Sequence, residues 1–139
     1  MKKKATLLGV PLDLGASKQG ASGGPAAIRR ANIVSALEAM GVHVEDGGDI
    51  VVAASKGGGK LKHGAAILKV CKDLEKKAYD VVKAGRIPIT LGGDHSLAMG
   101  SVSGVSHAYR DDGQNIGLIY VNAHADINTP DTSSSGNVH

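Results

Sequence analysis

Short runs of consecutive apolar residues alternate along the chain with longer stretches in which apolar residues recur every three or four positions. Short apolar runs bounded by glycine, proline or acidic residues are typical of buried β-strands. Such runs cover residues 6–10, 42–44, 87–91 and 116–121. The second run is followed by an expected turn at residues 46–49, and the fourth run is the most hydrophobic of the set.

The longer stretches have the periodicity of amphipathic helices. They predict helices over residues 25–40, 63–84 and 97–109. Pro25 stands at the favoured first position of a helix, and Gly41 and Gly85 stand where glycine commonly ends one. Strands that alternate with helices predict right-handed crossovers and a mainly parallel sheet with helices on both faces, which is a three-layer α/β/α fold.

The domain organisation follows from the same pattern. No internal repeat or linker divides the sequence, so we expect residues 1–139 to belong to a single α/β domain. After the strand predicted at 116–121, residues 127–139 are polar and show no periodicity. This would leave a sheet edge uncovered, so we expect the domain to be incomplete at its C-terminal side.

Potential metal ligands follow two of the predicted strands. Asn122, His124 and Asp126 come directly after the fourth strand at a spacing of two, so they project from one face of an extended chain. His95 follows the third strand in the sequence Gly-Gly-Asp-His-Ser. Because ligands bind beyond the carboxyl ends of parallel strands, these four residues predict a site for a divalent cation.

The loop at residues 92–96 also has a purely structural interpretation. Asp94 and Ser96 would then be turn and helix-capping residues, with Ser96 as the cap of the next helix and His95 exposed to solvent. The His-x-Asp pair is equally indecisive by itself. Two histidines and one aspartate at the ends of two consecutive apolar strands favour the metal site.

Composition excludes several other classes of function. The net charge of +3 equals the contribution of three lysines at positions 2–4, and the chain has no Trp or Phe, so no basic or stacking surface for nucleic acid is predicted. No apolar run approaches the ~20 residues that span a bilayer. Cys71 is the only cysteine, so no disulfide within the chain is possible, and we expect a cytoplasmic protein. The glycines before Lys60 do not form a P-loop, which would need glycine at Ala54 and Ser or Thr at Leu61.

Three segments together resemble the arginases of the ureohydrolase superfamily. They are residues 92–96 (Gly-Gly-Asp-His-Ser), 122–130 (Asn-Ala-His-Ala-Asp-Ile-Asn-Thr-Pro) and 134–139 (Ser-Ser-Gly-Asn-Val-His). The first loop and the His-x-Asp element are shared with agmatinases, whereas the Asn-Thr-Pro and Ser-Gly-Asn-x-His segments are similar to arginases specifically. The resemblance runs along the whole chain and covers about the N-terminal half of an arginase.

The resemblance implies hydrolysis of the guanidinium group of L-arginine to L-ornithine and urea at two manganese ions. His95 and Asp126 would ligate one ion, His124 the other, and residue 122 would bridge them. The implied substrate-binding residues are His124, Asn128, Ser135 and Asn137. The implied proton shuttle is His139, and the implied assembly of a full-length form is a homotrimer.

The chain departs from the family at position 122, where Asn122 replaces an aspartate. Two divalent cations bring four positive charges, whereas the four predicted ligands supply one negative charge, from Asp126. We therefore expect little or no activity from this chain alone. Two other hypotheses are a non-catalytic short form that associates with full-length arginase subunits, and another ureohydrolase such as an agmatinase.

Overall fold

The computed structural model describes residues 3–58, 60–123, 126–129 and 131–137. Three parallel strands form one sheet in the order β2-β1-β3. The strands are β1 (Lys4–Val10), β2 (His43–Asp49) and β3 (Ile87–Gly92). The helices are α1 (Gly24–Arg30), α2 (Ile33–Ala39), α3 (Gly64–Lys83) and α4 (Ala98–Asp111), with short 3₁₀ turns at Ala21–Gly23 and His95–Leu97.

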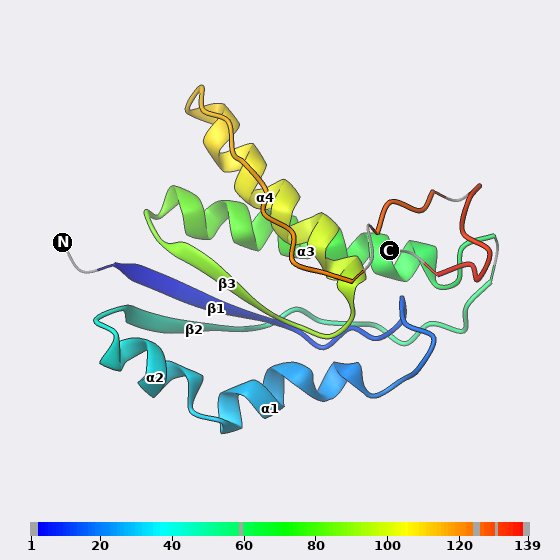
Figure 1. The fold of residues 1–139 in the computed structure, drawn as a ribbon, viewed down its shortest axis with the longest axis horizontal. Helices are drawn as coiled ribbons and strands as arrows, with labels where there is room; N and C mark the ends of the chain where they lie inside the picture. Colours follow the sequence, from blue (N-terminus) through cyan, green and yellow to red (C-terminus); the bar gives the residue numbers. More distant parts are fainter. Residues whose placement is uncertain (1–2, 59, 124–125, 130, 138–139) are drawn as a thin grey trace.

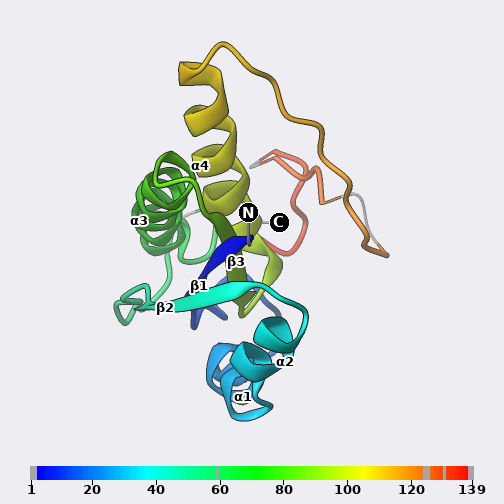
Figure 2. The same ribbon diagram turned by 90° about the vertical axis from the view of Figure 1, so that its left-hand side faces the viewer.

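The helices cover both faces of the sheet, as Figures 1 and 2 show. Helices α1 and α2 lie on one face, α3 lies on the other, and α4 packs against α3. The predicted three-layer α/β/α arrangement is confirmed. In the described part of the chain, no helix is long and apolar enough to cross a membrane.

The central strand β1 contributes side chains to two hydrophobic clusters, because successive side chains of a strand point to opposite faces. Leu7 packs with Val44, Leu91 and the apolar side of α2. Leu8 points the other way and packs with residues of α3, including Ile67 and Leu74. The uninterrupted apolar run at the start of the chain is therefore a strand that is buried on both faces.

Helices α3 and α4 cross at very short range because α4 carries glycines at the crossing. A Cβ atom on Gly100 would lie 2.5 Å from the carbonyl oxygen of Cys71, and one on Gly104 would lie 2.3 Å from that of Glu75. Cys71 is buried there, and its thiol donates to the carbonyl of Ser96 at 3.3 Å. Burial raises the pKa of this thiol.

The helix predicted at 25–40 is wrong in one respect, because it is two helices. The break falls at Ala31 and Asn32, and Asn32 takes a left-handed conformation with φ of 60°. Asparagine tolerates this conformation better than most residues, so the chain turns between α1 and α2 without a glycine.

The turn predicted at 46–49 is also wrong, since these residues belong to β2. The register with β1 shifts there, from Leu7 opposite Asp46 to Gly9 opposite Asp49. Gly48, with φ of 73°, supplies the left-handed backbone that such an irregularity requires. The glycines of segment 46–49 therefore mark an irregularity in β2 and not the end of its pairing with β1.

The fourth strand predicted at 116–121 is absent from the sheet. This run has no strand structure, and most of its apolar side chains face solvent, with Ile119 91% and Val121 94% exposed. Its first residues line a cavity of about 420 Å³ together with Pro88 and Thr90 of β3. An apolar run becomes an inner strand when both of its faces are covered, and the described residues place no second helix over this one.

Candidate metal centre

The loop after β3 is fixed against the loop after β1. Gly93 donates its N–H to the carbonyl of Val10 at 3.2 Å, and Asp94 donates its N–H to the carbonyl of Leu12 at 2.8 Å. A Cβ atom on Gly93 would lie 1.8 Å from that Leu12 oxygen, so only glycine permits this approach. The loops that follow β1 and β3 are thus hydrogen-bonded to each other immediately before His95.

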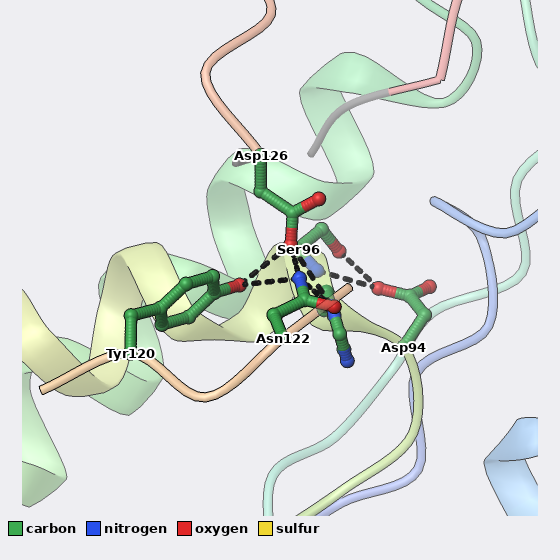
Figure 3. A network of polar contacts seen from close by, with 6 residues as sticks. Asp94, Ser96, Tyr120, Asn122 and Asp126 are labelled. Atoms are coloured by element: carbon green, nitrogen blue, oxygen red, sulfur yellow. Dashed lines mark hydrogen bonds and ion pairs between the residues drawn. The ribbon is translucent and has the colours of Figure 1, made fainter. Parts of the chain in front are cut away.

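Asp94 is a structural residue of this loop. Its buried carboxylate accepts the N–H of Gly15 at 2.7 Å and the N–H of Ser96 at 2.9 Å, together with the Ser96 hydroxyl. Asp94 therefore caps the 3₁₀ turn that leads into α4, and Ser96, the predicted helix cap, is instead a buried donor to Asp94 (Figure 3). With both neighbours turned inward, the side chain of His95 is left 58% exposed.

Three of the four predicted metal ligands lie together beyond the carboxyl end of β3. Nδ1 of His95 is 2.9 Å from Oδ2 of Asp126 and 3.1 Å from Nδ2 of Asn122. The Asn122 amide also donates to the same oxygen of Asp126 (Figure 3). His124, the fourth predicted ligand, lies outside the described residues.

Tyr120 belongs to the same cluster and was missed by the sequence analysis. Its hydroxyl donates to Oδ2 of Asp126 at 2.6 Å, and its ring meets the His95 ring edge-on at 6.4 Å between centroids. The hydrogen bond to the carboxylate raises the pKa of Tyr120. The signal was present, because Tyr120 stands two positions before Asn122 and so extends the same spacing.

Two of the three separations between the donor atoms fit one divalent cation. Neighbouring ligand atoms in an octahedral shell lie roughly 3 Å apart, since the bonds to a hard cation are roughly 2.1 Å long. The separations around His95 Nδ1 match this value, and rotation of Asn122 would present its amide oxygen in place of its nitrogen. No group of three His, Cys, Asp or Glu side chains able to hold a metal occurs within the described ranges, so among these residues Asn122 would be the third donor of the cluster.

The predicted substrate-binding residues do not all lie together. Asn128 lines a cavity of about 410 Å³ with His95, Tyr120 and Asp126, and its Oδ1 accepts from the Thr132 hydroxyl at 3.3 Å.

Ser135 and Asn137 are outside the lining of that cavity. The Ser135 hydroxyl accepts the Asn137 N–H at 3.2 Å, and the buried Asn137 amide donates to the Ser17 hydroxyl at 2.8 Å. Their loop is therefore attached to the loop after β1. The predicted proton shuttle, His139, lies outside the described residues.

The sequence of the chain matches the model of a known protein family. The model of the arginase family matches residues 3–139. The chain belongs to the arginase family. It is 42% identical over 142 residues to the arginase of Brevibacillus brevis, which covers all of this chain and 46% of that relative.

Solved arginases share the fold of this arginase-family chain. The arginase from Bacillus caldovelox superposes with a TM-score of 0.88 at 37% identity, over 99% of this chain and 46% of its own. The Entamoeba histolytica arginase in complex with L-ornithine gives a TM-score of 0.84 at 26% identity, over 99% and 48%. The chain thus spans about half the length of the relatives it matches, and the resemblance seen in the sequence is confirmed.

Proposed function

We propose that this chain contributes to arginase-type hydrolysis of the guanidinium group of L-arginine, which yields L-ornithine and urea. The observation that carries the proposal is the convergence of His95, Asn122 and Asp126 beside a cavity that Asn128 also lines. Support also comes from the arginase relatives, one of which was solved with L-ornithine, the amino acid that this reaction releases.

The proposed cofactor is manganese, with two ions in a complete site. His95 and Asp126 would hold one ion, His124 the other, and Asn122 would stand between them. When bound, the metal would act as a Lewis acid that lowers the pKa of water beside the guanidinium carbon.

The remaining residues would handle the substrate and the protons. His124, Asn128, Ser135 and Asn137 would face the substrate, where neutral donors suit an amino acid that carries both charges. His139 would move protons between solvent and the leaving amine, since imidazole titrates near neutral pH. We further propose that residues 1–139 are the N-terminal part of one cytoplasmic arginase-type domain, whose full-length form is a homotrimer.

Residues 1–139 alone should release little or no urea. Of the side chains that meet in the described cluster, only Asp126 brings a negative charge, which is too little for two divalent cations. The test is urea release by the purified chain with L-arginine and Mn²⁺, and robust manganese-dependent release would refute the expectation of inactivity. L-arginine and agmatine are compared as substrates on a full-length form, where a preference for agmatine would favour an agmatinase.

The Asn122→Asp variant tests the metal site directly. A carboxylate at this position would add a second negative charge within about 3 Å of the other donors, so we expect the affinity for Mn²⁺ to rise about tenfold. Free Mn²⁺ can be measured by electron paramagnetic resonance. Asn115→Asp is the control, because it adds the same charge at an exposed position outside the cluster. Equal gains in both variants would mean that the effect is general charge and not ligation.

A second candidate function is association with full-length arginase subunits, without catalysis. The exposed apolar side chains of Leu118, Ile119 and Val121 favour it, because such runs are usually covered by protein. The chain should then co-purify with a co-expressed full-length arginase, and Ile119→Lys should abolish this. Met40→Lys, at an exposed apolar residue next to α2, is the control. A failure of the wild-type chain to co-purify would remove this candidate.

A further inference from the structure

We propose that Tyr120 is a positioning residue of the metal site, whose hydroxyl orients the carboxylate of Asp126 and whose ring orients the imidazole of His95 toward a divalent cation. This inference rests on the proposed function, because it concerns the same cluster. It assigns a role to a side chain that is not itself a ligand.

Tyr120 lies next to both His95 and Asp126, the two predicted ligands whose side chains can carry a charge. Its hydroxyl is 2.6 Å from Oδ2 of Asp126, and the amide nitrogen of Asn122 is 3.5 Å from the same hydroxyl. Its ring plane stands at 71° to that of His95, so an edge of one ring meets the face of the other. Figure 3 shows the Tyr120 hydroxyl directed into the cluster between Asn122 and Asp126.

The Tyr120 hydroxyl is well placed to orient the carboxylate of Asp126. A carboxylate oxygen has two lone pairs, so Oδ2 of Asp126 can accept from Tyr120 and bind a cation once His95 Nδ1 and the rotated Asn122 amide, which also contact this oxygen, face the same cation. The Asp126 side chain is only 9% exposed, and its backbone has φ of 48°, so its carboxylate is presented from a constrained and partly desolvated place. Hydrogen bonds of this kind, from residues behind the ligands, typically contribute 10- to 100-fold to metal affinity.

The chain offers a matched control in Tyr79. Its hydroxyl also donates to an aspartate at 2.6 Å, but the partner is Asp111 at the end of α4, which takes no part in the cluster. Tyr120→Phe and Tyr79→Phe therefore remove the same atom from the same kind of hydrogen bond. Both tyrosines are at least partly exposed to solvent, so neither variant should unfold the chain.

The experiment measures Mn²⁺ binding by the full chain and both variants at one neutral pH, using electron paramagnetic resonance. We expect Tyr120→Phe to weaken binding about tenfold and Tyr79→Phe to leave it unchanged. Ultraviolet difference spectra supply a second readout. Addition of Mn²⁺ should perturb a tyrosine band in the wild type and in Tyr79→Phe, and the perturbation should be missing in Tyr120→Phe.

The outcomes separate this inference from the function on which it rests. If the wild type binds Mn²⁺ and Tyr120→Phe binds it equally well with the same spectral change, the positioning role is wrong and the metal site stands. If neither the wild type nor Asn122→Asp binds Mn²⁺, both the metal site and the role of Tyr120 are overturned.

Discussion

Two regions of the molecule meet at His95, and they are built in different ways. On one side is the end of the sheet, where Asp94 is buried and accepts backbone N–H groups from Gly15 and Ser96. On the other side is the extended segment 114–123 and the loop after it, where Asp126 is contacted by the side chains of Tyr120 and Asn122. Two aspartates near one histidine therefore have different surroundings, since the first accepts backbone N–H groups and the second is contacted by the side chains of the cluster.

The same difference appears in the glycines of the two regions. Gly93 lies at the sheet end in contact with the backbone of Leu12, whereas a Cβ atom on Gly117 would meet nothing within 4 Å. Two glycines of one chain can therefore differ widely in how well they tolerate substitution. What matters is whether another backbone occupies the space, since a backbone cannot move aside as a side chain can.

The largest expected effect comes from the pair Gly93→Ala and Gly117→Ala. The new methyl at 93 would stand 1.8 Å from the Leu12 oxygen, so the two strand ends must separate. We expect a loss of on the order of 3 kcal/mol or more in the free energy of unfolding. Urea unfolding followed by far-ultraviolet circular dichroism measures it. Gly117→Ala should be nearly neutral, and equal losses in both variants would contradict the contrast between the regions.

The second prediction compares the two aspartates. Asp94→Ala removes an acceptor and leaves the buried N–H groups of Gly15 and Ser96 without a partner, which should cost about 2 kcal/mol. Asp126→Ala should cost clearly less, because the exposed side chains of His95 and Tyr120 can turn to water.

The same unfolding experiment checks this order. A larger loss for Asp126→Ala would mean that the segment around it is as firmly integrated as the sheet end. If instead both losses were small, the hydrogen bonds of Asp94 would not be holding the loop after β3.

The sheet region was largely predictable from the sequence, and the other region was not. The helices expected at 63–84 and 97–109 are confirmed as Gly64–Lys83 and Ala98–Asp111, and the strand at 87–91 as Ile87–Gly92. The periodicity of a segment predicts its structure correctly where other helices and strands of the fold cover it. It failed at 116–121, because hydrophobicity says that a run should be buried but cannot say what will bury it.

The candidate site was predicted in part for the same reason. The sequence placed Asn122 and Asp126 beside His95, and the structure brings these side chains together. The geometry differs from the prediction, because residues 116–121 are not a strand of the sheet and Asp126 has a left-handed backbone with φ of 48°. The sequence named Ser96 as a cap, although Asp94 is an equally good cap residue. No local pattern could show that the Asp94 carboxylate also accepts the N–H of Gly15, which is distant in sequence. The same applies to Asn137, whose partner Ser17 no local pattern identifies.

The smallest expected effect concerns ion pairs and their dependence on pH. Asp46 of β2 accepts two hydrogen bonds from the Arg29 guanidinium, at 2.7 and 2.9 Å, and this contact lowers the pKa of its carboxyl. A carboxyl whose pKa is lowered in the folded state stabilises the fold above its unfolded pKa of about 3.9, and this contribution disappears as pH falls through the folded pKa. Asp46→Asn should therefore cost at most about 1 kcal/mol near neutral pH, because the pair is partly screened by solvent, and nothing at strongly acidic pH. Urea midpoints at both pH values measure this.

Asp131→Asn is the counterpart in the other region, where the contact with Lys60 is far more exposed, and no measurable change is expected at either pH. A cost for Asp46→Asn that persists in acid would show that the Arg29 contact acts through packing and not through charge, and an equal cost for Asp131→Asn would show that the loop after Asp126 is held as firmly as the sheet.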